Sequence, residues 1–187
     1  MSYHERDLPH CYPPDATLFL TWRLFGSLPC GFQDASISPT SGHAFAQMDR
    51  QLDAATNGLC WLRDARIAAL VAAALEQGES EYRLYQLFAW VIMPNHVHAV
   101  VRPHQPLPVI MRWLKGSTAR SANTILGRTG KKFWQCETYD HFIRNADEFN
   151  RIVKYVERNP VRAGLACSID DWPWSSAGRR PTPQNTA

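Results

Sequence analysis

The sequence has few cysteines, and their spacing argues against several kinds of site. The 187 residues include five, at widely separated positions: Cys11, Cys30, Cys60, Cys136 and Cys167. No two of them form a Cys-x-x-Cys pair, so neither a zinc ribbon, a dithiol redox centre nor a disulfide framework is expected. Long apolar runs are also absent, and the opening MSYHERDLPH has neither the basic start nor the apolar core of a signal peptide. We expect a cytoplasmic protein with no membrane association.

The composition is that of an ordinary folded protein, with 45% hydrophobic and 20% charged residues. This excludes disordered and collagen-like chains, and the length suits one domain with a buried core. We expect a single domain over residues 1–178. It contains a Gly/Pro-rich excursion at about 26–58 and is followed by a disordered tail at 179–187.

Positive charge is concentrated in one part of the chain. Between Arg102 and Arg162 there are twelve lysines and arginines against five carboxylates, a balance of +7, so the remainder of the chain sums to −4 within the net +3. This basic part is where a polyanion would bind.

Hydrophobic periodicity and turn residues predict seven elements in the main core. Strands are expected at 17–25, 82–93, 96–102 and 133–143, and helices at 64–77, 108–126 and 145–158, the last stopped by Pro160. A short helical stretch is expected near 44–55, inside the excursion. The βαββαβ order predicts an α+β, ferredoxin-like antiparallel sheet with helices on one face, which leaves the other face for a site.

Two histidines stand two residues apart in the predicted strand 96–102. Side chains at this spacing point to the same face of a strand, so His96 and His98 form a ready clamp for a metal ion. The alternative is that one ring bonds a backbone carbonyl and the other is solvated.

The predicted helix 145–158 carries a second cluster. Arg151 and Arg158 stand four before and three after Tyr155 and so share its face, and Asn159 follows one turn later. Because Asn159 precedes a proline, it is biased away from helical geometry. A tyrosine can attack a phosphodiester when a cation polarises the phosphate and nearby positive charge favours the phenolate.

Four segments, in order along the chain, resemble signatures of known families. The HUH motif of HUH endonucleases is similar to WVIMPNHVHAVVRP. REP-associated tyrosine transposases, a single-tyrosine branch related to insertion-sequence transposases, have segments that resemble FWQCETYDHFIRN, YVERNPVRAGL and DWPWSSA. The resemblance extends from about Pro9 to Ala177. It implies a nuclease that cuts single-stranded DNA beside hairpins of repetitive extragenic palindromes, using Mg²⁺ or Mn²⁺, with a C-terminal catalytic helix. The nucleophile would be Tyr155, and the metal ligands would be His96, His98 and Asn159.

The third ligand departs from more distant single-tyrosine relatives, which have Gln where this chain has Asn159. Two imidazoles also suit softer ions better than magnesium, so manganese fits the ligand set more comfortably. Tyr139 is the reserve nucleophile, and Asp140 is a candidate for orienting a ligand imidazole.

Basic residues beside aromatic ones suit a single-stranded nucleic acid backbone with unstacked bases. Trp113 and Trp134 are the candidates for stacking on a base. The protein is expected to act as a monomer or a homodimer. The predicted DNA-binding residues are Arg112, Lys115, Arg120, Arg128, Lys131, Lys132, Arg151, Lys154 and Arg158.

The sequence is also compatible with two other functions. One is a regulator that binds hairpin DNA without cutting it, whose affinity would depend on salt but not on a chelator. The other is a zinc-dependent hydrolase that uses the His pair with a water nucleophile.

Overall fold

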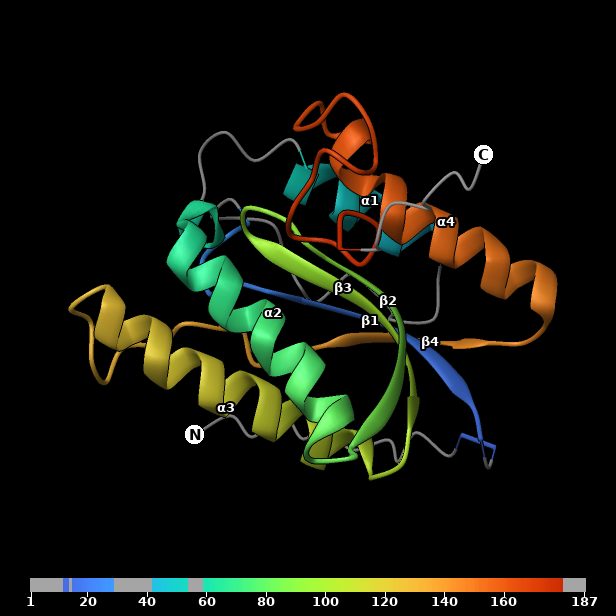
Figure 1. Ribbon diagram of the computed structural model, residues 1–187, viewed down its shortest axis with the longest axis horizontal. Helices are drawn as coiled ribbons and strands as arrows, with labels where there is room; N and C mark the ends of the chain where they lie inside the picture. The colour runs from blue at the N-terminus through green and yellow to red at the C-terminus, as the bar shows by residue number, and fades with distance from the viewer. Residues whose placement is uncertain (1–11, 14, 29–41, 54–58, 180–187) are drawn as a thin grey trace, which may run out of the picture.

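A four-stranded antiparallel sheet forms the centre of the computed structural model, which describes residues 12–13, 15–28, 42–53 and 59–179 (Figure 1). The strands lie in the order β2 (Tyr85–Ile92), β3 (His96–Pro103), β1 (Thr17–Arg23) and β4 (Tyr139–Ile143). The predicted hairpin is present: β2 and β3 pair across Pro94 and Asn95, and the Met93 amide donates to the His96 carbonyl over 2.9 Å.

One face of the sheet is covered by α2 (Ala65–Ser80) and α3 (Leu107–Ile125), and a 3₁₀ turn at Trp61–Arg63 precedes α2. Asp64 caps α2 by accepting from the Arg66 amide, as an acid at a helix start should. Gly78 of α2 allows a close approach, since a Cβ there would lie 2.2 Å from the Tyr85 hydroxyl. The main apolar core lies between these helices and the sheet.

The opposite face carries α4 (Ala146–Arg162) and, beside it, α1 (Gly42–Asp53) (Figure 1). A second, smaller apolar cluster forms here, with Phe19, Val91, Val100 and Val156 buried at its centre. Val97 and Ala99 belong to the main core, so the alternation along β3 turns His96 and His98 toward this second face. The predicted βαββαβ order and the α+β class are confirmed, and the face away from α2 and α3 holds the site.

Three local predictions are wrong. The last strand begins at Tyr139 instead of residue 133. Residues 133–135 pair with residues 23–25 only as an isolated bridge, and the chain then turns aside so that the carbonyls of residues 135–137 bond the Lys115 ammonium. Helix α4 continues through Pro160 to Arg162, because the amides of Ala163 and Leu165 still bond the carbonyls of Asn159 and Pro160 although Pro160 has no amide hydrogen of its own. Tyr82, expected in a strand, lies in the turn before β2 and is 55% exposed.

Within the described part of the chain, no helix combines the length and the apolar character needed to span a bilayer. Helix α1 confirms the short helical stretch expected in the excursion. Most of the remaining excursion and residues 180–187 of the predicted tail lie outside the described residues.

Candidate active site

The two histidines of β3 lie side by side in the interior. Both are fully buried, their Nε2 atoms are 3.1 Å apart, and the ring centroids are 4.6 Å apart. Both rings are fully buried, so the alternative in which one of them is solvated is wrong. The structure therefore brings the two predicted ligands together at one point.

The outer nitrogens of these rings are held by neutral side chains. His96 Nδ1 donates to the Asn95 amide oxygen over 2.7 Å, and Asn95 Nδ2 in turn donates to the Leu52 carbonyl over 2.9 Å. Because the Asn95 oxygen can only accept, this network assigns the proton of His96 to Nδ1 and leaves a lone pair on Nε2. His98 Nδ1 lies 2.7 Å from Thr21 Oγ1, a hydroxyl that satisfies either tautomer. Asn95 and Thr21 thus have the orienting role that the sequence suggested for Asp140.

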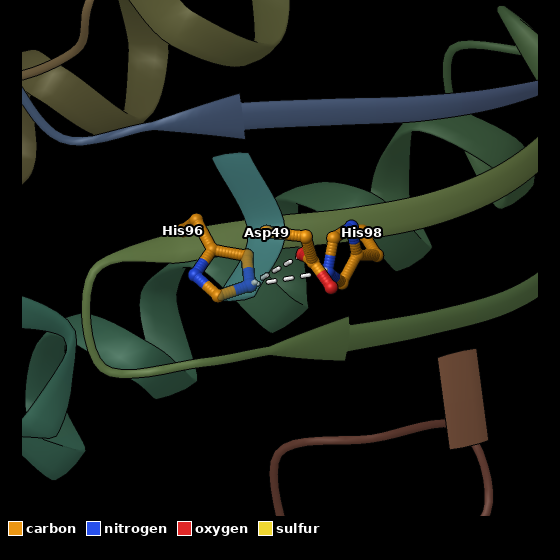
Figure 2. A group of neighbouring side chains, drawn as sticks. All are labelled: Asp49, His96 and His98. Atoms are coloured by element: carbon orange, nitrogen blue, oxygen red, sulfur yellow. Dashed lines mark hydrogen bonds and ion pairs between the residues drawn. The ribbon is translucent and has the colours of Figure 1, made fainter. Parts of the chain in front are cut away.

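A carboxylate that the sequence analysis missed completes the cluster (Figure 2). Asp49 of α1 is 1% exposed, and its Oδ1 lies 3.1 Å from His98 Nε2 and 3.8 Å from His96 Nε2. One donor atom from each of the three residues lies within 4.8 Å of the other two. No local pattern links Asp49 to the histidines, because the contact depends on how α1 packs over the sheet.

Tyr155 reaches this cluster from α4. Its hydroxyl donates to Asp49 Oδ2, and its ring meets the His98 ring edge-on with centroids 5.8 Å apart. The predicted relationship between a strand with two imidazoles and a helix with one phenol is therefore present. The reserve nucleophile, Tyr139 of β4, packs edge-on against Phe19 of β1, and burial raises the pKa of the Tyr139 phenol.

The guanidinium over the Tyr155 ring belongs to Arg162, with Cζ 4.8 Å from the ring centroid. The same group lies 3.9 Å from Asp53 Oδ2. Arg151 and Arg158, which helical spacing favoured, have exposed side chains, and Arg151 lies 3.8 Å from Glu148. Because α4 continues through Pro160, Arg162 comes two turns after Tyr155 on the same face.

The buried charges shift the pKa values of the site. Burial, followed by repulsion from His98, lowers the pKa of His96 to about 3, so its ring is neutral at neutral pH. Burial works to raise the pKa of the Asp49 carboxyl, but the charge and hydrogen bond of His98 hold it well below the ordinary value. Burial and then the Asp49 charge raise the pKa of the Tyr155 phenol far above its ordinary value, against the influence of Arg162. Without added positive charge, the phenolate is strongly disfavoured.

Asn159, the third predicted ligand, lies on α4, the helix that also carries Tyr155. It is 0% exposed, lies one turn after Tyr155 inside α4, and neither of its amide atoms has a hydrogen-bond partner within the described residues. The expected departure of Asn159 from helical geometry is wrong, since the helix continues past it. An unpartnered buried amide costs about 1–3 kcal/mol, which an ion bound by its oxygen would offset.

The donor atoms of this site fit a divalent ion. The neutral His96 nitrogen has its lone pair directed inward, His98 presents its Nε2 beside it, and an ionised carboxylate lies against both. Imidazole and carboxylate together form a set that suits Mn²⁺ as well as softer ions.

Four of the predicted DNA-binding residues line one groove, of about 530 Å³, between α3 and residues 131–136: Arg112, Lys115, Lys131 and Lys132. Three of these side chains are exposed, but the Lys115 ammonium donates to the carbonyls of Gln135, Cys136 and Glu137 over 2.8–3.0 Å. Burial lowers the pKa of Lys115 to about 8. Lys115 therefore supports the fold of this segment.

The other predicted nucleic acid contacts divide between surface and interior. Arg120 and Lys154 are exposed, and the Arg128 guanidinium lies 3.8 Å from the centroid of the Trp61 ring. Trp134 is 7% exposed and donates its indole N–H to Thr118, which makes it a core residue and not a stacking platform. Trp113 packs against Tyr82 with ring centroids 4.7 Å apart.

The chain is similar to known DNA-acting proteins. Residues 64–159 match the family model described as "Transposase IS200 like". A REP-associated tyrosine transposase of Escherichia coli K12 is 29% identical over 100 residues, which are 52% of this chain and 57% of the relative. A putative REP-associated tyrosine transposase of Haemophilus influenzae is 26% identical over 110 residues, 53% of this chain and 62% of the relative. Each match thus spans less than two thirds of the relative.

A solved structure shares the fold over nearly the whole chain. It is a REP-associated tyrosine transposase bound to a REP hairpin, with a TM-score of 0.54 and 20% identity, and the superposition covers 96% of this chain and 84% of that one. Both α1 and Asp49 lie before the first residue that the family model matches.

Proposed function

The chain belongs to the IS200-like transposase family, and from this premise we propose that it is a metal-dependent endonuclease and strand-transferase that acts on single-stranded DNA beside palindromic hairpins. The observation that carries the proposal is the meeting of Tyr155 with His96 and His98 in one buried cluster, centred on the carboxylate of Asp49. A nucleophile and a metal-binding group must be neighbours for this chemistry.

In the proposed reaction, the Tyr155 oxygen attacks the scissile phosphorus. A bond forms between phosphorus and the phenolic oxygen, and the bond from phosphorus to the 3′ oxygen of the preceding nucleotide breaks. The phenol gives up its proton to solvent, and the departing 3′ oxygen takes one up. The products are a 5′-phosphotyrosine and a free 3′-hydroxyl. Attack by a 3′-hydroxyl on the phosphotyrosine reverses these steps and joins the strands.

His96, His98 and Asn159 are the proposed protein ligands of the divalent ion, and Mn²⁺ or Mg²⁺ is the expected cofactor. When bound, the ion supplies Lewis acidity to the phosphate and positive charge that favours the phenolate. His96 is already in the neutral form that a ligand requires, and Asn95 and Thr21 hold the two rings in place.

Arg162 has the role that the sequence favoured for Arg151 and Arg158. Its guanidinium covers the Tyr155 ring, and its positive charge lowers the cost of forming the phenolate at the ring's oxygen. Arg151, Lys154 and Arg158 are exposed along the same helix, which suits contacts to the DNA backbone beside the cut.

Hairpin DNA is the proposed partner. The groove between α3 and residues 131–136 presents the exposed cations Arg112, Lys131 and Lys132 beside buried aromatic residues. A positively charged groove of this kind follows a nucleic acid backbone. The solved structure with the same fold is bound to a REP hairpin, which supports the same class of partner here.

The test uses an oligonucleotide with a hairpin and single-stranded flanks, labelled on its 3′ side. It is incubated with the protein and Mn²⁺, with and without a chelator, and resolved on a denaturing gel. The expected result is a labelled protein band that requires Mn²⁺ and is absent with Tyr155→Phe, although this variant still binds the hairpin. An adduct with the Phe variant would refute the nucleophile. Hairpin binding without any adduct would indicate a regulator, and release of a free 5′-phosphate without an adduct would indicate a hydrolase.

A further inference from the structure

Helix α1 lies outside the family-model match and yet supplies a side chain to the centre of the site. The matched residues begin at 64, whereas α1 ends at Asp53. The helix lies beside α4 on the face of the sheet that carries the histidines (Figure 1). The part of the Gly/Pro-rich excursion that the structure describes thus borders the reacting groups directly.

The position of α1 is fixed by contacts on both sides of Asp49. Met48 and Leu52 are buried, and the Leu52 carbonyl accepts from Asn95, the residue whose amide oxygen holds His96. One turn after Asp49, Asp53 lies 3.9 Å from Arg162 of α4. These contacts direct Asp49 at the histidines and join the helix to both neighbouring elements of the site.

Relying on the proposed function, we propose that Asp49 is a catalytic residue that ligates the divalent ion through Oδ1 and holds the Tyr155 hydroxyl through Oδ2. Helix α1 then completes the metal centre and is part of the enzyme's active site.

The distances support the ligand role. The Nε2–Nε2 distance and the distance from Asp49 Oδ1 to His98 Nε2 are both 3.1 Å, and that from Oδ1 to His96 Nε2 is 3.8 Å. Atoms bound to one ion by bonds of about 2.0–2.2 Å are separated by distances of this size. Asp49 is 1% exposed, and a buried carboxylate needs a positive charge beside it. An ion bound at these three atoms would take the place of the His98 charge that holds the pKa of Asp49 low in the metal-free protein.

The two oxygens of Asp49 serve different neighbours. Oδ2 accepts from the Tyr155 hydroxyl, so the carboxylate uses only Oδ1 toward the histidines. Binding in this mode would keep the nucleophile within reach of a phosphate held by the same ion. A carboxylate also adds a hard oxygen to the two imidazoles, which shifts the ligand set toward Mn²⁺.

Substitution by cysteine tests ligation without using activity. Co²⁺ is added to the chelator-treated, full-length Asp49→Cys variant, and the absorption spectrum is recorded. A thiolate bound to cobalt gives a charge-transfer band in the near ultraviolet, and the variant should show this band at one equivalent. The wild type, with its native cysteines, and Gln51→Cys, at an exposed position of the same helix, should not. Absence of the band in Asp49→Cys, under conditions where the wild type binds Co²⁺, would overturn the proposal and leave the proposed function intact.

Affinity for Mn²⁺ provides the second measurement, by titration of the metal alone with calorimetry. Removing a residue that only orients a metal ligand lowers metal affinity by about 10–100-fold. Asp49→Asn alters a proposed ligand itself, so it should bind Mn²⁺ at least about tenfold more weakly than the wild type. Gln51→Ala, at an exposed position of the same helix, should stay within about twofold. Equal affinities for Asp49→Asn and wild type would overturn the proposal. If the wild type binds no Mn²⁺, or if His98→Ala binds it as tightly as the wild type, the metal site of the proposed function and the role of Asp49 are both refuted.

Discussion

The hydroxyl of Tyr155 on α4 donates to the carboxylate of Asp49 on α1, across 106 positions of the chain. The same carboxylate lies against both histidines of β3. Three elements that are distant in sequence therefore meet at one buried acid. This arrangement makes the phenol costly to ionise in the protein alone and ties its activation to added positive charge.

Arg162 should matter for the rate of cleavage and not for binding of DNA. Replacing it by Gln removes the charge from the face of the Tyr155 ring, where a cation contributes about 0.5–2 kcal/mol. We expect single-turnover adduct formation to slow by about tenfold while hairpin affinity stays within about twofold. Arg158→Gln is the matched control, since its exposed side chain should affect DNA affinity more than rate. Equal rates for Arg162→Gln and wild type would remove Arg162 from the reaction.

Asn159 should lower the stability of the metal-free protein. Its buried amide has no hydrogen-bond partner among the described residues, and Leu is similar in size without the polar atoms. Asn159→Leu should therefore raise the melting temperature in chelator by a few degrees, equivalent to about 1 kcal/mol, and should weaken Mn²⁺ binding. Thermal unfolding with and without Mn²⁺ measures both effects. A fall of several degrees in chelator would mean that the amide has a stabilising partner.

Lys115 and Lys132 line the same groove, but substituting Lys115 should affect the stability of the fold, whereas substituting Lys132 should affect DNA binding. Lys115→Met removes three hydrogen bonds to backbone carbonyls and should destabilise the protein by about 2 kcal/mol. Lys132→Met should leave stability within about 0.5 kcal/mol but reduce the salt dependence of hairpin binding. Chemical denaturation and binding at several salt concentrations test the pair. Reversed effects would place the DNA contact at Lys115.

The pKa of Lys115 should also make stability depend on alkaline pH. Burial lowers it to about 8, against 10.5 for the ordinary side chain. Between these values the unfolded chain holds the proton and the folded one has lost it, so stability rises with pH through this window; below about 8 both states are protonated. The difference in unfolding free energy between wild type and Lys115→Met should therefore grow from pH 8 to pH 10.5. A difference that shrinks would contradict the lowered pKa.

Much of the fold follows from local sequence, and part of the site does not. The alternation along β3 and the helical spacing around Tyr155 predict which faces carry the histidines and the phenol, because strand and helix geometry are local. Asp49 could not be found in this way, since its position depends on the packing of α1 against β3 and α4. Arg162 was missed for a different reason: Pro160 is expected to end the helix, but the backbone bonds that follow it, from Ala163 to Asn159 and from Leu165 to Pro160, carry the helix on to Arg162.

The most direct test of the account is to map the trapped protein–DNA adduct to a single side chain. The complex formed with hairpin DNA and Mn²⁺ is digested with protease and nuclease, and the peptide that retains a nucleotide is sequenced by mass spectrometry. We predict that the nucleotide is attached through a 5′-phosphate to Tyr155. Attachment to Tyr139, or to any residue other than Tyr155, would contradict the account.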